Sequence, residues 1–291
     1  MTRFIYRIYR KAKRHFVNNP SSFISRLFFR LLMAADKIMS PRLKPQLAAE
    51  QKIWKSVYFL RYGSTPPYFV ETVAPVAFDS DDHKWPRGTL YDNSVNRNFN
   101  LRLYNYFSYR HDLRVMDLGC SGGGMVKSFL EDGYTAVGLE GSDISKKLRS
   151  AEWDTIPYHL FTCDITEPFN VKDTLGNTVK FHCITAWDVL EHIPESKLPE
   201  LFENIKRHLA PDGIFVCSID TTPDGNPLTG AVYHVSVHDK GWWLDRFEAA
   251  GFCEVERSPF SGKEDFVRGN GAGFKDWDPD DGDGFHLVLK I

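Results

Sequence analysis

The chain has 291 residues, 42% of them hydrophobic and 25% charged, which is the balance of a globular protein large enough to bury a sizeable core. It contains no run of eighteen apolar residues, so we expect no membrane-spanning helix. The five cysteines form no C-x-x-C pair, which argues against a zinc or disulfide framework and for reduced thiols in a cytoplasmic protein.

The formal net charge of −2 hides an uneven distribution of charge along the chain. Residues 1–35 carry eight Lys and Arg side chains and no Asp or Glu. Residues 36–291 therefore carry 28 basic and 38 acidic side chains, a balance of −10. A domain this acidic is a poor candidate for binding the phosphates of a nucleic acid, so we expect no nucleic-acid partner.

Residues 1–50 are expected to form a basic amphipathic helical extension. Four arginines from Arg3 to Arg14 recur at spacings of four, three and four residues, which places them on one face of a helix, and apolar side chains recur on another face. Such a helix can make peripheral contact with an anionic membrane through residues 1–35. The alternative is that it packs on its own domain. An arginine-rich, acid-free start also resembles a mitochondrial transit peptide.

Residues 51–110 are interpreted as a cover segment followed by a leading helix. Residues 61–95 are rich in Pro, Asp and aromatic side chains, which predicts irregular structure. Asn93 or Ser94 is then expected to cap a helix that runs through Phe107.

Residues 111–291 alternate strand-like and helix-like patterns and are predicted to form the main domain. This alternation favours a parallel sheet covered by helices on both faces. The last two strand-like runs are joined by a long polar loop, which favours an antiparallel closing pair. The predicted fold is α/β, a Rossmann-like doubly wound, mostly parallel seven-stranded sheet with an antiparallel last strand, plus the N-terminal helical extension. The strand-like runs are residues 113–118, 135–140, 158–163, 181–187, 213–219, 252–258 and 285–290. The helical patterns are residues 122–132, 143–151, 188–193, 197–209 and 239–250.

The most informative segment is Val115-Met-Asp-Leu-Gly-Cys-Ser-Gly-Gly-Gly124, where a strand ends in a glycine-rich turn that opens a helix. Glycine lets the backbone approach a ligand closely, and a helix N-terminus favours negative charge. Asp117 would repel a pyrophosphate but can accept hydrogen bonds from the ammonium group of an amino-acid-like ligand. Ser121 also breaks the glycine spacing of dinucleotide-binding turns. These two residues disfavour a nicotinamide oxidoreductase.

This segment resembles the first motif of the class I S-adenosylmethionine-dependent methyltransferases, which reads roughly acid-x-Gly-x-Gly-x-Gly. Asp117, Gly119, Ser121 and Gly123 match the motif, with Ser121 as the departure. The resemblance covers about residues 95–258 and is similar in detail to O-methyltransferases of sugars, natural products and the ubiquinone pathway. It implies S-adenosylmethionine as the cofactor, with Cys120 also in the cofactor-binding turn.

The resemblance places further cofactor-binding residues at the ends of the following strands. Glu140, at the tip of the second strand, matches the acid that holds the ribose hydroxyls, with Asp143 as a substitute or a helix cap. Asp164 matches the residue that accepts a hydrogen bond from the adenine amino group, and Ile165 would cover the ring. The residues expected to line the methionine part of the cofactor are Ala186 and Trp187.

The acceptor side requires a group that can take a proton. Methyl transfer is an in-line displacement, in which the protein holds the acceptor near the methyl group and, for a hydroxyl acceptor, removes its proton. His192 is the leading candidate for this base, because it follows the fourth strand at the edge where such sheets bind ligands. Asp220 matches an acid that accompanies this histidine in some sugar O-methyltransferases, and His234 is a second catalytic candidate. Alternatively, His192 only braces its helix against the sheet.

A divalent cation is the alternative to a base. Asp188, Glu191 and His192 fall at i, i+3 and i+4 of an expected helix, and this face could hold Mg²⁺ or Mn²⁺ with His234 as a further ligand. Because the same pattern is common in metal-free relatives, we predict no metal site and leave a cation at these residues as an open alternative.

Taken together, the resemblance implies methyl transfer to a hydroxyl group of a sugar or polysaccharide intermediate, or of a similar small molecule. One alternative is O-methylation of a lipid or quinone at a membrane surface. Another is a catalytically silent binding module with the same fold. Asp117, Glu140 and Asp164 favour an active cofactor pocket over the silent module. The individual acceptor within these classes and the oligomeric state are left open.

Overall fold

The computed structural model describes residues 49–63, 65–80, 83, 92–226, 229–260, 265–266 and 284–291. The chain divides into two compact units, one of Met1–Arg61 with Gly271–Gly273 and one of Tyr62–Asn270 with Phe274–Ile291. The described part of the first unit is a helix over residues 49–61. The predicted basic helix up to residue 48 lies outside the described residues. No helix within the described ranges is long and apolar enough to cross a membrane.

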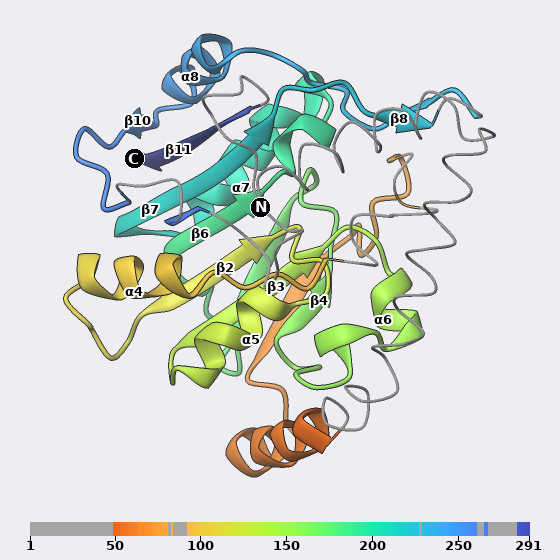
Figure 1. The fold of residues 1–291 in the computed structure, drawn as a ribbon, viewed down its shortest axis with the longest axis vertical. Coiled ribbons are helices and arrows are strands. Elements are labelled where there is room, and N and C mark those ends of the chain that lie inside the picture. Colours follow the sequence, from red (N-terminus) through yellow and green to blue (C-terminus); the bar gives the residue numbers. More distant parts are fainter. Residues whose placement is uncertain are drawn as a thin grey trace, which may run out of the picture. The chain divides into compact units, whose positions relative to one another are not determined.

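The second unit is built on a seven-stranded sheet with the strand order β10-β11-β7-β6-β2-β3-β4 (Figure 1). Strand β11 runs antiparallel to both of its neighbours, and the other strands from β7 to β4 pair parallel. The predicted α/β fold, with an antiparallel last strand on a mostly parallel sheet, is therefore confirmed. The strands of this sheet are β2 (Arg114–Leu118), β3 (Thr135–Glu140), β4 (Leu160–Thr162), β6 (Phe181–Trp187), β7 (Leu209–Asp220), β10 (Cys253–Glu254) and β11 (Gly284–Lys290).

Strand β6 lies in the middle of the sheet, between β7 and β2. All seven of its residues are buried, which is typical of a parallel strand that is covered on both faces. The strand order reverses beside it, since β2 is followed outward by β3 and β4, whereas β6 is followed by β7 on the other side. Open α/β sheets bind ligands at the carboxyl ends of the strands at such a switch point. We therefore expect the site at the ends of β2 and β6.

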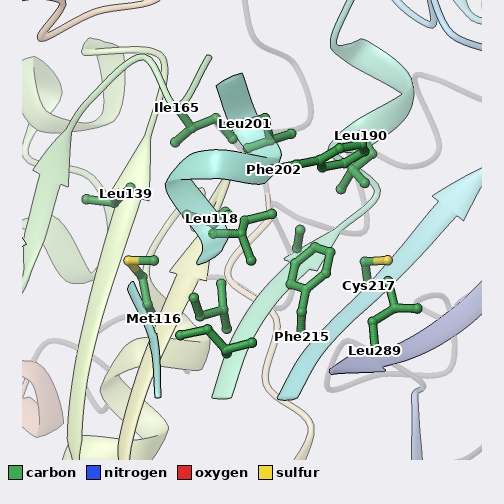
Figure 2. Close-up of a cluster of buried hydrophobic side chains, with 14 of the residues drawn as sticks. Met116, Leu118, Leu139, Ile165, Leu190, Leu201, Phe202, Phe215, Cys217 and Leu289 are labelled. Atoms are coloured by element: carbon green, nitrogen blue, oxygen red, sulfur yellow. The ribbon is translucent and has the colours of Figure 1, made fainter. Parts of the chain in front are cut away.

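Helix α7 shows how apolar spacing directs a helix onto the sheet. Leu198, Leu201, Phe202 and Ile205 are buried and recur at i, i+3, i+4 and i+7, so they form one stripe. Figure 2 shows Leu201 and Phe202 among side chains from β2, β3, β7 and β11. The helices of this unit are α4 (Arg97–Tyr106), α5 (Gly124–Glu131), α6 (Ile144–Leu148), α7 (Leu198–His208) and α8 (Lys240–Ala249).

A pair of strands was not predicted. Strand β1 (Tyr68–Thr72) lies in the segment expected to be irregular, and it pairs antiparallel with β5 (Phe169–Asp173). The partners are about a hundred residues apart, and the pairing of Thr72 with Phe169 is set by tertiary packing that no local pattern reveals.

Two local predictions about helix ends were wrong. Asn96, instead of Asn93 or Ser94, caps α4, and its side chain accepts the Phe99 N–H at 3.0 Å. The expected helix of residues 188–193 is reduced to a 3-10 turn, Leu190–His192. Asp188 interrupts it with a left-handed backbone, φ 51°.

Buried His208, at the end of α7, predicts an acid-sensitive fold. Its Nε2 atom accepts the Val171 N–H at 3.0 Å, and its Nδ1 atom lies 2.8 Å from the Asn204 carbonyl oxygen. Desolvation by burial lowers the pKa of His208 from 6.5 to about 4. A lowered pKa favours the neutral ring, so the stability it contributes is complete above pH 6.5 and is lost as the pH falls through about 4. The full loss amounts to about 3 kcal/mol.

Denaturant unfolding between pH 7 and pH 4 measures this loss. The His208→Gln variant should show a flatter dependence of unfolding free energy on pH than the native chain. The matched control is His111→Gln, at an exposed histidine, which should keep the native slope. An unchanged slope in His208→Gln would contradict the assignment.

Candidate active site

The glycine-rich turn between β2 and α5 adopts backbone conformations that favour glycine. Gly119 has a φ of 68°, and Gly123, which caps α5, has a φ of 87°. A Cβ atom on Gly119 would lie 2.4 Å from Cγ2 of Val189, and one on Gly123 would lie 2.6 Å from Cδ1 of Leu160. Both positions therefore require glycine for conformation and for packing.

Ser121, the departure from the family motif, also has a left-handed backbone, with a φ of 52°. This conformation accounts for glycine being usual at that position. The Ser121 hydroxyl donates to the Asp92 carbonyl oxygen at 2.8 Å, and the Gly122 N–H donates to the same oxygen at 3.0 Å. The segment before α4 thus lies against the turn, a contact for which the sequence carries no local signal.

Asp117 lies at the carboxyl end of β2 and is 4% exposed. The Thr185 hydroxyl of β6 donates to its Oδ1 atom at 2.6 Å. This bond fixes the carboxylate at the switch point of the sheet, beside the glycine-rich turn. There it can accept hydrogen bonds from the ammonium group of a ligand. Thr185 was not singled out from the sequence, because a threonine within a buried strand is most often a packing residue.

Glu140, at the end of β3, is tied directly to the turn. Its Oε2 atom accepts the Ser121 N–H at 2.9 Å, and its Oε1 atom accepts the Ser142 N–H at 3.0 Å. Burial raises the pKa of Glu140, and these N–H groups oppose the rise. Asp143 begins α6 without a capping side-chain bond and forms an ion pair with Lys147 at 2.8 Å. Glu140 is therefore the acid that contacts the turn.

Asp164 follows β4, at the same edge of the sheet. Its Oδ1 atom accepts the N–H of Thr166 at 2.9 Å and the hydroxyl of Thr166 at 2.6 Å, which orients the carboxylate. Neighbouring Ile165 is 7% exposed, and its side chain packs in the main core (Figure 2). The expected contact of Ile165 with an adenine ring stays a prediction.

The end of β6 lies beside the turn. Ala186 pairs with Leu118 of β2. Trp187 is 5% exposed, and the ring of Phe99 meets it edge-on with centroids 5.1 Å apart. Cys120 is a buried free thiol within the turn. The structure therefore brings the candidate cofactor residues of β2, β3 and β6 together around one loop.

The candidate catalytic residues also lie close together. The ring centroids of His192 and His234 are 4.7 Å apart, with ring planes at 81°. The Nδ1 atom of His234 lies 2.5 Å from the carbonyl oxygen of Thr222. Asp220, the last residue of β7, accepts the N–H and hydroxyl of the same threonine on Oδ1, at 2.6 and 2.5 Å. Burial raises the pKa of Asp220, and its hydrogen bonds to Thr222 and the nearby His234 oppose the rise.

Glu191 holds this cluster together, a role that was not predicted. Its carbonyl oxygen accepts the N–H groups of Val235 and Ser236, at 2.8 and 2.9 Å, and its Oε1 atom accepts the Asp220 N–H at 3.2 Å. The segment that carries His234 and the end of β7 are thereby fixed to one turn. The Glu191 side chain is fully buried, and desolvation, followed by the charge of Asp188, raises its pKa to about 8.

A potential metal site overlaps the same cluster. Glu191, His192 and His234 each offer a ligand atom, and these atoms lie within 4.8 Å of one another. The Oε2 atom of Glu191 is buried and makes no hydrogen bond within the described part of the chain. The prediction that Asp188 shares a helical face with Glu191 and His192 is wrong, because Asp188 has a left-handed backbone. Its Oδ1 atom instead accepts the Ser218 hydroxyl at 2.5 Å. The remaining arrangement suits a proton acceptor or a divalent cation.

Comparison with known protein families identifies the family of this chain. Residues 91–263, more than half of the chain, match the model of a family described as a methyltransferase domain. The chain belongs to this family. The class I S-adenosylmethionine-dependent methyltransferase that the motifs implied is confirmed, with S-adenosylmethionine as its cofactor.

Curated relatives of this methyltransferase match part of its length. It is 30% identical over 135 residues to a ubiquinone biosynthesis O-methyltransferase of Actinobacillus pleuropneumoniae, a match that covers 44% of this chain and 56% of the relative. It is 29% identical over 135 residues to the enzyme of the same name from Haemophilus ducreyi, with 44% and 55% covered. The chain therefore spans about half the length of the curated relatives it matches.

Solved structures with a similar fold are more distant in sequence. A glycopeptide N-methyltransferase, MtfA, in complex with S-adenosylmethionine has 14% identity and a TM-score of 0.43, and covers 67% of this chain and 94% of its own. A TehB-like methyltransferase from Corynebacterium glutamicum has 17% identity and a TM-score of 0.44, with 71% and 92% covered. The family assignment rests on the match of residues 91–263.

Proposed function

We propose that this chain transfers the methyl group of S-adenosylmethionine to a hydroxyl group of a sugar or polysaccharide intermediate, or of a similar small molecule. The observation that carries the proposal is the contact of His192 with His234, which is held at Thr222 together with Asp220, the last residue of β7. The acceptor oxygen attacks the methyl carbon, the bond from that carbon to the sulfonium breaks, and the hydroxyl proton passes to His192. S-adenosylhomocysteine leaves as the second product.

The cofactor is proposed to lie along the carboxyl ends of the strands from β4 to β6. Asp117 would accept hydrogen bonds from the ammonium group, and Ala186 and Trp187 would line the methionine part. Glu140 would bind the ribose hydroxyls, and Asp164 would accept a hydrogen bond from the adenine amino group. The order of these residues along the sheet edge, β6, β2, β3 and β4, supports this assignment.

Two observations favour this acceptor class. The names of the curated relatives support an oxygen acceptor. The resemblance of the motifs to sugar O-methyltransferases favours a carbohydrate hydroxyl, consistent with a cytoplasmic role in polysaccharide biosynthesis. The second candidate is a lipid or quinone, which the relatives' names and the acid-free basic residues 1–35 favour.

Turnover with radiolabelled S-adenosylmethionine tests the acceptor class. Nucleotide sugars and oligosaccharides form one panel, and catechols with a lipid tail form the other, each with and without anionic liposomes. We expect label to enter the sugar panel and turnover to be independent of liposomes. Label in the second panel, dependent on liposomes, would favour the membrane alternative. Cofactor binding without turnover on any hydroxyl would favour the silent binding module.

Removal of divalent cations separates a base from a metal site at Glu191, His192 and His234. With a histidine base, dialysis against a chelator should leave the turnover rate within about twofold, because His192 needs no cation to accept a proton. A drop in turnover rate of tenfold or more after dialysis, which Mg²⁺ or Mn²⁺ reverses in the native chain but not in Glu191→Gln, would contradict the metal-free prediction.

A further inference from the structure

The segment that follows β1 lies against the two strand ends assigned to the adenosine half of the cofactor. We name residues 73–80 the strap. The strap precedes residues 91–263, the part of the chain that matches the methyltransferase family. It is therefore a feature of this chain beyond the family match.

Two backbone hydrogen bonds attach the strap to the strand ends that carry Asp164 and Glu140. The Ala74 carbonyl oxygen accepts the Asp164 N–H at 2.9 Å, and the Ala77 N–H donates to the carbonyl oxygen of Gly141, the residue after Glu140, at 2.9 Å. The fit at Gly141 is tight, since a Cβ atom there would lie 3.1 Å from the Ala77 Cβ atom. The strap thus runs from the end of β4 to the end of β3.

The outer end of the strap is also held. Asp79 forms an ion pair with Lys197 at 3.4 Å, and the same ammonium group lies 3.3 Å from Glu167, three residues beyond Asp164. This pair is partly exposed, so we assign it a positioning role with little contribution to stability.

An exposed aromatic ring lies at this attached edge. Phe78 is 67% exposed, and its ring centroid is 4.7 Å from that of His83. The His83 carbonyl oxygen accepts the Ser142 hydroxyl at 3.3 Å, and the Ser142 N–H is bonded to Glu140. Phe78 is therefore linked through two residues to the acid assigned to the ribose.

One buried polar atom in the same group has no hydrogen-bond partner within the described ranges. The Nδ1 atom of His83 is buried and makes no hydrogen bond to any described residue. Buried polar atoms are satisfied in most folded proteins, so an unsatisfied one beside an assigned ligand site calls for an explanation. A ligand that carries hydroxyl groups and ring nitrogens would supply the missing partner.

We infer that the strap forms the outer wall of the adenosine subsite, with the Phe78 ring packed on the adenosine and His83 as a hydrogen-bonding group. This inference rests on the proposed roles of Glu140 and Asp164. An aromatic ring on the purine would account for a large apolar side chain left in solvent without ligand. The strap residues would then set the affinity for the adenosine half and leave the methionine half unaffected.

Titration calorimetry with two ligands tests this wall. S-adenosylhomocysteine reports on the whole cofactor site, and 5′-methylthioadenosine, which lacks the amino-acid part, reports on the adenosine end. Phe78→Ala should weaken both ligands by about tenfold or more, the usual effect of removing one aromatic stack on a base. The matched control is Phe69→Ala, at a 45% exposed phenylalanine of β1, which should stay within about twofold.

A second variant tests the polar contact. His83→Phe keeps a ring beside Phe78 and removes the buried nitrogen, so both ligands should weaken by about two- to tenfold, the range for one neutral hydrogen bond. If Phe78→Ala keeps native affinity for both ligands while Asp164→Ala lowers it, the proposed role of the strap is wrong and the cofactor assignment stays intact. Native affinity in Asp164→Ala and Glu140→Gln as well would overturn the assignment on which the strap depends.

Discussion

Asp117→Asn should weaken the binding of S-adenosylhomocysteine by about ten- to one-hundredfold, because a hydrogen bond to a charged group contributes about 1.5–3 kcal/mol. The variant removes the negative charge while an amide oxygen still accepts the Thr185 hydroxyl, which is bonded to Oδ1 of Asp117 in the native chain. The fold should therefore be kept. Titration calorimetry on the folded variant measures the effect.

Thr185→Val is the matched control for Asp117→Asn. It removes the orienting hydroxyl but keeps the carboxylate, so we expect a loss of a few-fold, the value of one neutral hydrogen bond. A native affinity in Asp117→Asn, or an equal loss in both variants, would contradict the proposed contact between Asp117 and the ammonium group.

His192→Asn should lower kcat by about one-hundred- to ten-thousandfold, the usual contribution of a positioned general base. Its affinity for S-adenosylhomocysteine should stay native, because His192 lies on the acceptor side, 4.7 Å from His234. Steady-state turnover with the accepted hydroxyl compound and calorimetry on the same preparation measure the two effects separately.

His238→Asn serves as the control histidine. His238 lies outside the cluster and forms an exposed pair with Glu195 at 2.7 Å. We expect native kcat in this variant. If His192→Asn keeps kcat within a few-fold of the native value, His192 braces its turn against the sheet and the base lies elsewhere, with His234 as the next candidate.

The sheet could be predicted because its strands carry their own signals. Strands β3 and β6 are rich in apolar residues, and their bounds match the predicted runs 135–140 and 181–187. Pairing between distant segments could not be predicted. Strand β1 pairs with β5, and Asp92 contacts the glycine-rich turn. Neither contact has a local sequence signal that identifies the two partners.

In the candidate site, too, residues with a local sequence signal could be predicted and contacts between distant segments could not. Asp117, Glu140 and Asp164 could be singled out because they match the family's motifs, in which each acid stands at or directly after a strand. The role of Glu191 could not be predicted, since it depends on hydrogen bonds from the backbone of Val235 and Ser236 in a later segment. The helical face expected at Asp188 failed because one left-handed residue redirects its side chain.

Titration of S-adenosylhomocysteine into the purified full chain, with NADH as the control ligand, tests the central claim most directly. Asp117, Glu140 and Asp164 converge at one edge of the sheet, and this arrangement predicts micromolar binding of S-adenosylhomocysteine with no heat from NADH. A folded protein that binds NADH, or that binds neither ligand, would contradict the cofactor site described for this chain.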